Sequence, residues 1–284
     1  MQHPFKRIVI LLNDLENMES LLQKGVSFAN EHDTLLEVLF VHEVPLFEVP
    51  DYFLPDEKIS ESIVDKDKIK EKIEEHLDNL HLENEHAIFV YENDTIDRIN
   101  TLIPQIEGTL ILTQYHDELS SQLIEETPYT YWIIKKESTT QDIAFTIDLE
   151  DKFQPYLMWI KHIFPEAKIE LIHNYRYMLD PLVTTQDYLI VEPLTQELDI
   201  EMNKVLREQK METFNNYKNA LDLEGTFLEG DGVFNDDIIS YLQNKHFNLT
   251  VLCRDNVDIF FSSSLINEFM EKVSTDFFIC QVSD

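Results

Sequence analysis

The chain has 284 residues, of which 43% are hydrophobic, so it can bury the cores of two modest domains. Its formal net charge of −33 divides into −18 for residues 1–140 and −15 for residues 141–284, which indicates a solvated surface rather than an acidic tail. This charge disfavours nucleic acids and anionic membranes as partners. Because no apolar run approaches the ~18 residues of a membrane span and no signal peptide is recognised, we expect a cytoplasmic protein. The two cysteines, Cys253 and Cys280, fit neither a disulfide framework nor a metal motif.

The first half of the chain alternates between apolar strands and amphipathic helices. An apolar run in residues 7–13 precedes a helical pattern that continues to residue 30, and residues 35–42 form a second apolar run. Residues 65–80 then carry Ile69, Ile73, Leu77 and Leu80 on one helical face. Further strands are expected near residues 86–92, 109–114 and 129–134, with helices near residues 99–103 and 119–126 between them.

The second half of the chain repeats this order. Asp14-Leu15-Glu16 has its counterpart in Asp148-Leu149-Glu150, each following an apolar strand. Later segments correspond too: residues 167–175, 225–232, 249–254 and 276–283 read as strands. A helix over residues 201–221 carries the apolar residues Met202, Val205, Leu206, Phe214, Tyr217 and Leu221. This self-similarity predicts two domains, residues 1–138 and 142–284, joined at a polar stretch.

Strands that alternate with helices predict an α/β fold with parallel sheets covered on both faces. Each copy is therefore expected to form one doubly wound domain with right-handed crossovers. The short linker favours two domains that pack together about a pseudo-two-fold axis as an intramolecular pseudo-dimer. The two final strands, residues 129–136 and 276–283, are expected to pair within one chain or with a second chain in a homodimer.

The repeated unit resembles the universal stress protein family in its tandem form. The resemblance rests on the first strands VILLND and AFTIDLED, on the fourth strands GTLILT and LTVLCR, and on the closing stretch SSSLINEFMEKVSTDFFI. It implies five-stranded sheets with strand order 3-2-1-4-5. An ATP-binding subset of that family carries Gly-x2-Gly-x9-Gly-Ser/Thr after strand four. None of the five glycines of this chain lies in either corresponding loop, so the resemblance implies a degenerate nucleotide site.

Seven residues are candidates for a binding site, and each has a structural alternative. Asp14 and Asp148 end the first strands of the two copies, where the family contacts a nucleoside, but an aspartate there also caps helices. Ser263 and Ser264 stand where the family places Gly-Ser, with Arg254 as a nearby cation, and a helix cap is the alternative. Gly230 and Asp231 follow the third strand of the second copy, where the alternative is a tight turn. The seven candidates are Asp14, Asp148, Gly230, Asp231, Arg254, Ser263 and Ser264.

The segment of residues 45–57, with Pro45, Pro50 and Pro55 among aromatic residues, reads either as a lid or as a docking segment. No catalytic motif, P-loop or dinucleotide fingerprint occurs, so we expect no enzyme activity. The sequence favours a non-catalytic stress or regulatory protein that acts through protein contacts or self-association, without a cofactor. The alternative is a module that binds a nucleotide such as ATP or AMP, or another small anion, in the second copy only.

Overall fold

The structure is a computed structural model, and it describes residues 4–43, 65–92, 94–103, 108–136, 140–149, 151–176, 193–230, 235–254 and 263–282. The predicted segment of residues 45–57 lies outside these residues. Contacts between Cα atoms divide the chain into two compact units. The first unit comprises Met1–Ser138 together with Asp276–Ser283, and the second comprises essentially Thr139–Thr275.

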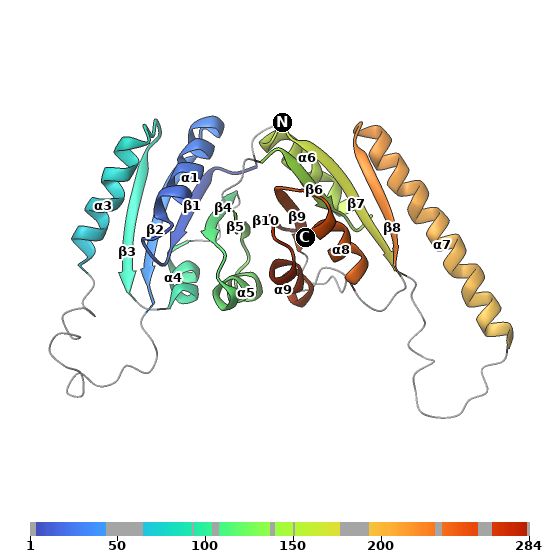
Figure 1. Cartoon of the computed structure of the whole chain (residues 1–284). Coiled ribbons are helices and arrows are strands. Elements are labelled where there is room, and N and C mark those ends of the chain that lie inside the picture. Colours follow the sequence, from blue (N-terminus) through green and yellow to red (C-terminus); the bar gives the residue numbers. More distant parts are fainter. Residues whose placement is uncertain are drawn as a thin grey trace, which may run out of the picture. The chain divides into compact units, whose positions relative to one another are not determined.

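The first unit is built on a parallel sheet of the predicted order. Its strands are β1 (Arg7–Leu12), β2 (Leu35–His42), β3 (His86–Glu92), β4 (Thr109–Gln114) and β5 (Thr130–Ile134), and they lie side by side as β3-β2-β1-β4-β5. All neighbouring pairs among these five strands are parallel. Every residue of β1 is buried, because this central strand has neighbouring strands on both sides and helices on both faces. The sequence-based prediction of strand order 3-2-1-4-5 is confirmed here (Figure 1).

Helices cover both faces of this sheet. Helix α1 (Met18–His32) packs beside α3 (Lys66–Asn79), and α4 (Thr95–Leu102) packs beside α5 (Asp117–Glu126). Gly25 brings α1 close to β1, because a Cβ atom at this position would lie 2.3 Å from Cδ1 of Ile10. Val9, the next residue of β1 toward the N-terminus, lines a cavity on the opposite face with Leu102 and Ile103 at the end of α4. The sheet is therefore doubly wound, with α1 and α4 on opposite faces.

The last strand of the chain belongs to the first unit. Strand β10 (Asp276–Gln281) pairs antiparallel with β5, with Phe278 opposite Trp132. Phe278 also packs against Phe5, with ring centroids 6.1 Å apart. The predicted pairing of the two final strands within one chain is thus confirmed, and it adds an antiparallel edge to the otherwise parallel sheet of the first unit.

The second unit has a parallel sheet of four strands in the order β9-β6-β7-β8. These strands are β6 (Asp142–Thr146), β7 (Lys168–Arg176), β8 (Glu224–Gly230) and β9 (Leu249–Arg254). A 3-10 turn, η2 (Asp151–Phe153), leads into α6 (Gln154–Ile163), and α7 (Pro193–Ala220) packs on β7 and β8. Helix α8 (Asp236–Asn244) packs on β8, and α9 (Ser263–Lys272) precedes β10.

The apolar residues of the 28-residue helix α7 are only partly buried. Phe214 and Tyr217 are buried against the sheet as expected. Met202, Val205 and Leu206 are instead exposed, by 62%, 48% and 47%. Only the C-terminal half of α7 therefore packs its apolar residues against the core.

Candidate functional site

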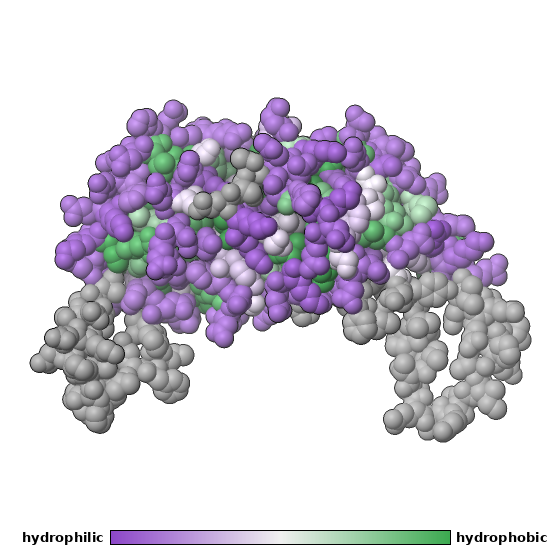
Figure 2. All heavy atoms as spheres, viewed as in Figure 1, coloured by the Kyte–Doolittle hydropathy of each residue, from purple (hydrophilic) through white to green (hydrophobic). Residues whose placement is uncertain are grey.

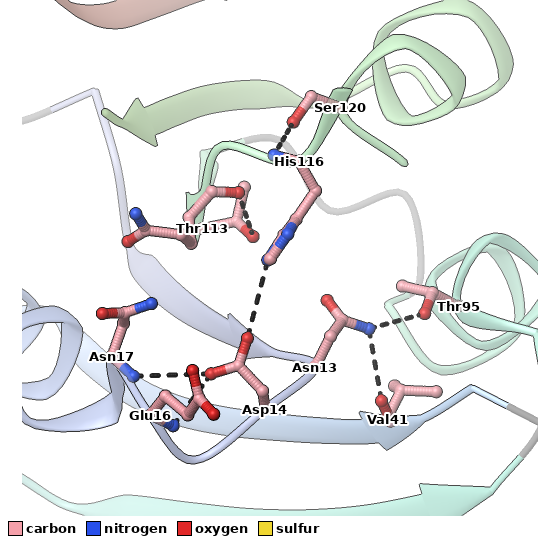
Figure 3. A network of polar contacts seen from close by, with 10 residues as sticks. Asn13, Asp14, Glu16, Asn17, Val41, Thr95, Thr113, His116 and Ser120 are labelled. Atoms are coloured by element: carbon pink, nitrogen blue, oxygen red, sulfur yellow. Dashed lines mark hydrogen bonds and ion pairs between the residues drawn. The ribbon is translucent and has the colours of Figure 1, made fainter. Parts of the chain in front are cut away.

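The first candidate site lies where β1 ends in the first unit, at the carboxyl edge of the sheet. Asp14 follows β1, and its Oδ1 accepts hydrogen bonds from the backbone N–H groups of Glu16 at 2.9 Å and Asn17 at 3.4 Å (Figure 3). This is a turn stabilised by an aspartate side chain. The helix itself starts later, with Asn17 in the N-cap position of α1. The alternative reading of Asp14 as the helix cap is therefore wrong, because Asp14 organises the turn that precedes the helix.

His116 approaches Asp14 from the loop after β4, which is where the nucleotide-binding loop would begin. Nε2 of His116 lies 3.9 Å from Oδ2 of Asp14, and both side chains remain partly exposed (Figure 3). The backbone N–H of His116 donates to Oγ of Ser120 at 2.9 Å, which fixes the start of α5. The first turn of α5 carries Asp117 and Glu118. These carboxylates oppose an anion at this helix N-terminus, because they occupy the positive end of the helix dipole themselves.

Little space remains between these groups. The cavity lined by Asp14, Asn17, Met18, Gln114 and His116 has a volume of about 10 Å³. That is the size of a single water site, whereas small-molecule pockets measure on the order of 300 to 1,000 Å³. The described residues around Asp14 and His116 thus leave room for about one water molecule between them.

Asn13 closes the same edge from the other side. Its Nδ2 donates to the carbonyl oxygen of Val41 at 3.2 Å and to Oγ1 of Thr95 at 2.8 Å (Figure 3). One side chain thus joins the ends of β1 and β2 to the first turn of α4. Thr95 is fully buried, so this contact belongs to the packed interior.

The second candidate site lies at the corresponding edge of the second unit. Asp148 follows β6, is 9% exposed, and has its Oδ1 3.5 Å from Nζ of Lys210 on α7. Arg254 at the end of β9 is also buried, with 4% of its surface exposed. Among the described residues of this edge, two cations therefore accompany Asp148: the buried guanidinium of Arg254 and the ammonium group of Lys210.

His173 of β7 lies beneath the same edge. Its Nδ1 lies 2.8 Å from the carbonyl oxygen of Ile147, so Nδ1 carries the proton, because a carbonyl only accepts. Within the described part of the chain, the buried Nε2 has no hydrogen-bond partner. Burial lowers the pKa of His173 to about 4, and the positive charge of Lys210 acts in the same direction, against the bond to Ile147. His173 is thus a neutral imidazole at physiological pH.

The structure describes some of the predicted residues and leaves others undescribed. Gly230 ends β8, and a Cβ atom there would lie 2.9 Å from Oδ2 of Asp237 and 3.4 Å from Oδ1 of Asn174. Asp231 lies outside the described residues, and so do the side chains of Ser263 and Ser264, although α9 begins at Ser263. Sequence reasoning missed His173 and Lys210. Neither stands in a motif, and only their placement on β7 and α7 brings them beneath Asp148.

No group of three or more histidine, cysteine, aspartate or glutamate side chains in the described part of the chain is arranged to hold a metal ion. Among the described helices, none combines the length and the apolar character needed to cross a membrane.

Solved structures share this fold across the whole chain. A universal stress protein from Archaeoglobus fulgidus DSM 4304 is similar with a TM-score of 0.60 and 12% identity, covering 98% of this chain and 97% of its own. A protein of unknown function from Pseudomonas aeruginosa PAO1 is similar with a TM-score of 0.63 and 12% identity, covering 98% and 93%. The sequence matches no protein-family model and no curated protein significantly. The chain therefore has the tandem universal-stress-protein fold that its sequence pattern predicts.

Proposed function

We propose that this chain is a non-catalytic, universal-stress-like protein of the cytoplasm that serves a stress response or regulation through protein contacts. The observation that carries the proposal is how little space the described residues leave at the carboxyl edge of the first unit. There, Asp14 and His116 leave a cavity of about 10 Å³ in the position where the fold offers a ligand crevice. The acidic first turn of α5 supports the same conclusion. If the first unit holds no ligand at this edge, contacts between its surface and other proteins are the function that remains for it.

Ligand binding tests the proposal directly. Thermal unfolding and calorimetry are measured with ATP and AMP, each with and without magnesium. A ligand at a hundred times its Kd stabilises a protein by about 2.7 kcal/mol, so millimolar nucleotide reveals any site of micromolar affinity. We expect no saturable binding in the first unit. Saturable binding that is lost in Asp14→Asn but kept in Asp148→Asn would contradict the proposal.

A second candidate function is the binding of a nucleotide or small anion in the second unit alone. It is favoured by the buried Arg254 and by the approach of Lys210 to Asp148. The test is a calorimetric titration with ATP and with pyrophosphate, using Lys210→Ala and the control Lys204→Ala on the exposed side of the same helix. Loss of binding in Lys210→Ala alone supports this candidate. Equal weakening in both variants, or no binding in the wild type, rules it out.

A further inference from the structure

Strand β3 has an open edge in the first unit. It is the terminal strand of the order β3-β2-β1-β4-β5 and pairs only with β2 among the described strands. The backbone N–H of Leu36 donates to the carbonyl oxygen of Glu85, while Leu36 stands opposite His86. In a parallel pair, this pattern means that the backbone N–H and C=O groups of the odd-numbered residues of β3 point toward β2. The backbone N–H and C=O groups of His86, Ile88 and Val90 therefore point to the free edge.

A groove runs along this edge between β3 and α3. It has a volume of about 650 Å³ and is lined by residues 86–89 of β3 and by one stripe of α3. The ion pair of Lys66 with Glu92 at 3.3 Å and the contact of Glu74 with His86 at 3.1 Å show that the helix runs antiparallel to the strand. The groove thus has an exposed strand backbone on one side and a helix surface on the other. Extended peptides are commonly bound in such grooves as an added strand.

The lining of the groove has a definite chemistry. Asp67, Lys70, Glu71 and Glu74 form its helical side, at spacings that place them on one face of α3. The helical side of the groove thus carries three carboxylates and one ammonium group. The side chain of Phe89 lies on the other face of β3, because His86 contacts α3 and side chains alternate along a strand, and it is 40% exposed. Figure 2 shows mostly hydrophilic residues at the surface in the area of α3, with small apolar areas between them. A strand added at this edge would meet carboxylates on the face of α3 and Phe89 on the other face, which selects an extended segment that alternates basic and apolar residues.

We propose that the groove between α3 and the free edge of β3 binds an extended basic segment of a partner protein, which joins the sheet as a further strand. This inference rests on the proposed role in protein contacts and names the surface that makes them. A second copy of the chain is a poor occupant, because pairing β3 with β3 would bring the acidic stripes of two α3 helices together in a chain of net charge −33. The occupant is therefore a different protein of opposite charge.

The first test measures binding of a fluorescein-labelled peptide of about ten residues that alternates lysine with valine, a length typical of a strand. Its counterpart alternates glutamate with valine. Binding is measured by fluorescence anisotropy in about 0.15 M salt. The salt screens charges that are more than ~8 Å apart, so the measured affinity reflects local contacts. We expect the lysine peptide to bind and the glutamate peptide not to bind. Absence of saturable binding by the lysine peptide would overturn the proposal.

Matched variants separate the groove from the general acidity of the chain. The double variant Asp67→Lys/Glu71→Lys should weaken binding by about tenfold or more, because it reverses two charges that line the groove. The control Glu31→Lys/Glu126→Lys makes the same change of charge on exposed residues of α1 and α5. Similarly, Phe89→Ala should weaken binding, whereas Leu35→Ala, at another exposed apolar residue, should not. Equal effects in variants and controls would show mere attraction to an acidic surface and would overturn the proposal.

Amide exchange on the wild-type protein gives a readout that needs no variant. Without peptide, the amides of Ala87 and Phe89 should exchange slowly, since they face β2, whereas those of Ile88 and Val90 should exchange quickly. Saturation with the lysine peptide should slow the exchange of Ile88 and Val90 specifically. Binding without this protection would overturn strand addition. Such a failure leaves the nucleotide titrations of the proposed function untouched, so the two proposals fail separately.

Discussion

The ammonium nitrogen of Lys24 on α1 lies 2.9 Å from Oδ2 of Asp276, the first residue of β10, although the two residues are 252 positions apart. The other carboxylate oxygen, Oδ1, accepts hydrogen bonds from the backbone N–H groups of Lys135 and Lys136 at 2.9 and 2.8 Å. The side chain of Asp276 is 3% exposed. One buried carboxylate thus connects the last strand both to α1 and to the end of β5.

Removing this carboxylate should destabilise the first unit. We expect Asp276→Ala to lower the free energy of unfolding by about 3 kcal/mol, because it leaves a poorly solvated ammonium and two backbone N–H groups without their acceptor. Asp276→Asn should cost less, since its amide oxygen can still accept from the two backbone groups. Urea unfolding followed by tryptophan fluorescence is suitable, because Trp132 packs against Phe278 of β10. Equal losses in the two variants would show that the backbone hydrogen bonds contribute little.

The buried His173 should make the second unit sensitive to acid. Its folded pKa of about 4 lies below the unfolded value of about 6.5, so the unfolded state binds the proton first as the pH falls. Stability is therefore full above pH ~6.5 and is lost toward pH 4, by about 3 kcal/mol from this group alone. Unfolding free energies at several pH values should fall less steeply for His173→Phe than for the wild type. The control His246→Gln, at an exposed histidine, should follow the wild type.

Adding a single methyl group at Gly25 should lower the stability of the protein. Alanine normally stabilises a helix by about 1 kcal/mol relative to glycine. At this position its Cβ would lie 2.3 Å from Cδ1 and 2.8 Å from Cγ1 of Ile10, which is fully buried. We therefore expect Gly25→Ala to destabilise the protein by about 1 to 3 kcal/mol through overpacking.

A double-mutant cycle checks this cause. Ile10→Val removes Cδ1, so the cost of Gly25→Ala should be smaller in that background than in the wild type. Thermal or urea unfolding of the four proteins measures the coupling. Additive losses would mean that the helix moves as a whole rather than meeting Ile10.

Asn13 offers a test of the closed edge of the first unit. Asn13→Asp replaces a donor with a carboxylate that faces the carbonyl oxygen of Val41. We expect a loss of about 2 kcal/mol at neutral pH, because two hydrogen bonds are lost and the buried acceptors lose their partner. Part of this loss should be recovered in acid, where the new carboxyl group binds a proton. Asn17→Asp, which adds the same charge at an exposed position of the same edge, should have little effect.

The fold was predictable because its signals are local and repeated. Buried strands such as β1 and β4 are continuous apolar runs, and the repeat of Asp-Leu-Glu after β1 and β6 gave the number of units. The exposed apolar residues of α7 were not predictable, because periodicity shows that a face exists but not how much of it the core covers.

The site was less predictable than the fold. Asp14 and Asp148 could be placed at strand ends from the sequence, and both lie there. The neighbours that determine their chemistry come from distant elements: His116 follows β4, and Lys210 lies on α7. No spacing along the chain encodes those approaches. The same holds for Lys24 and Asp276, which meet only because β10 lies at the edge of β5.

The pairing of β5 with β10 also has a consequence for synthesis. Lys135 and Asp276 are 141 residues apart, and at about 5 to 20 residues per second a ribosome needs on the order of ten seconds to add that length. The first five strands can fold during this interval, since domains fold from the N-terminus as they emerge. During this interval, the edge of β5 that later pairs with β10 has no β10 to pair with, because β10 has not yet been synthesised. On a polysome, the strand that pairs with this edge can come from the same nascent chain or from a neighbouring one. We therefore expect the translation rate to influence the proportions of monomer and strand-exchanged dimer.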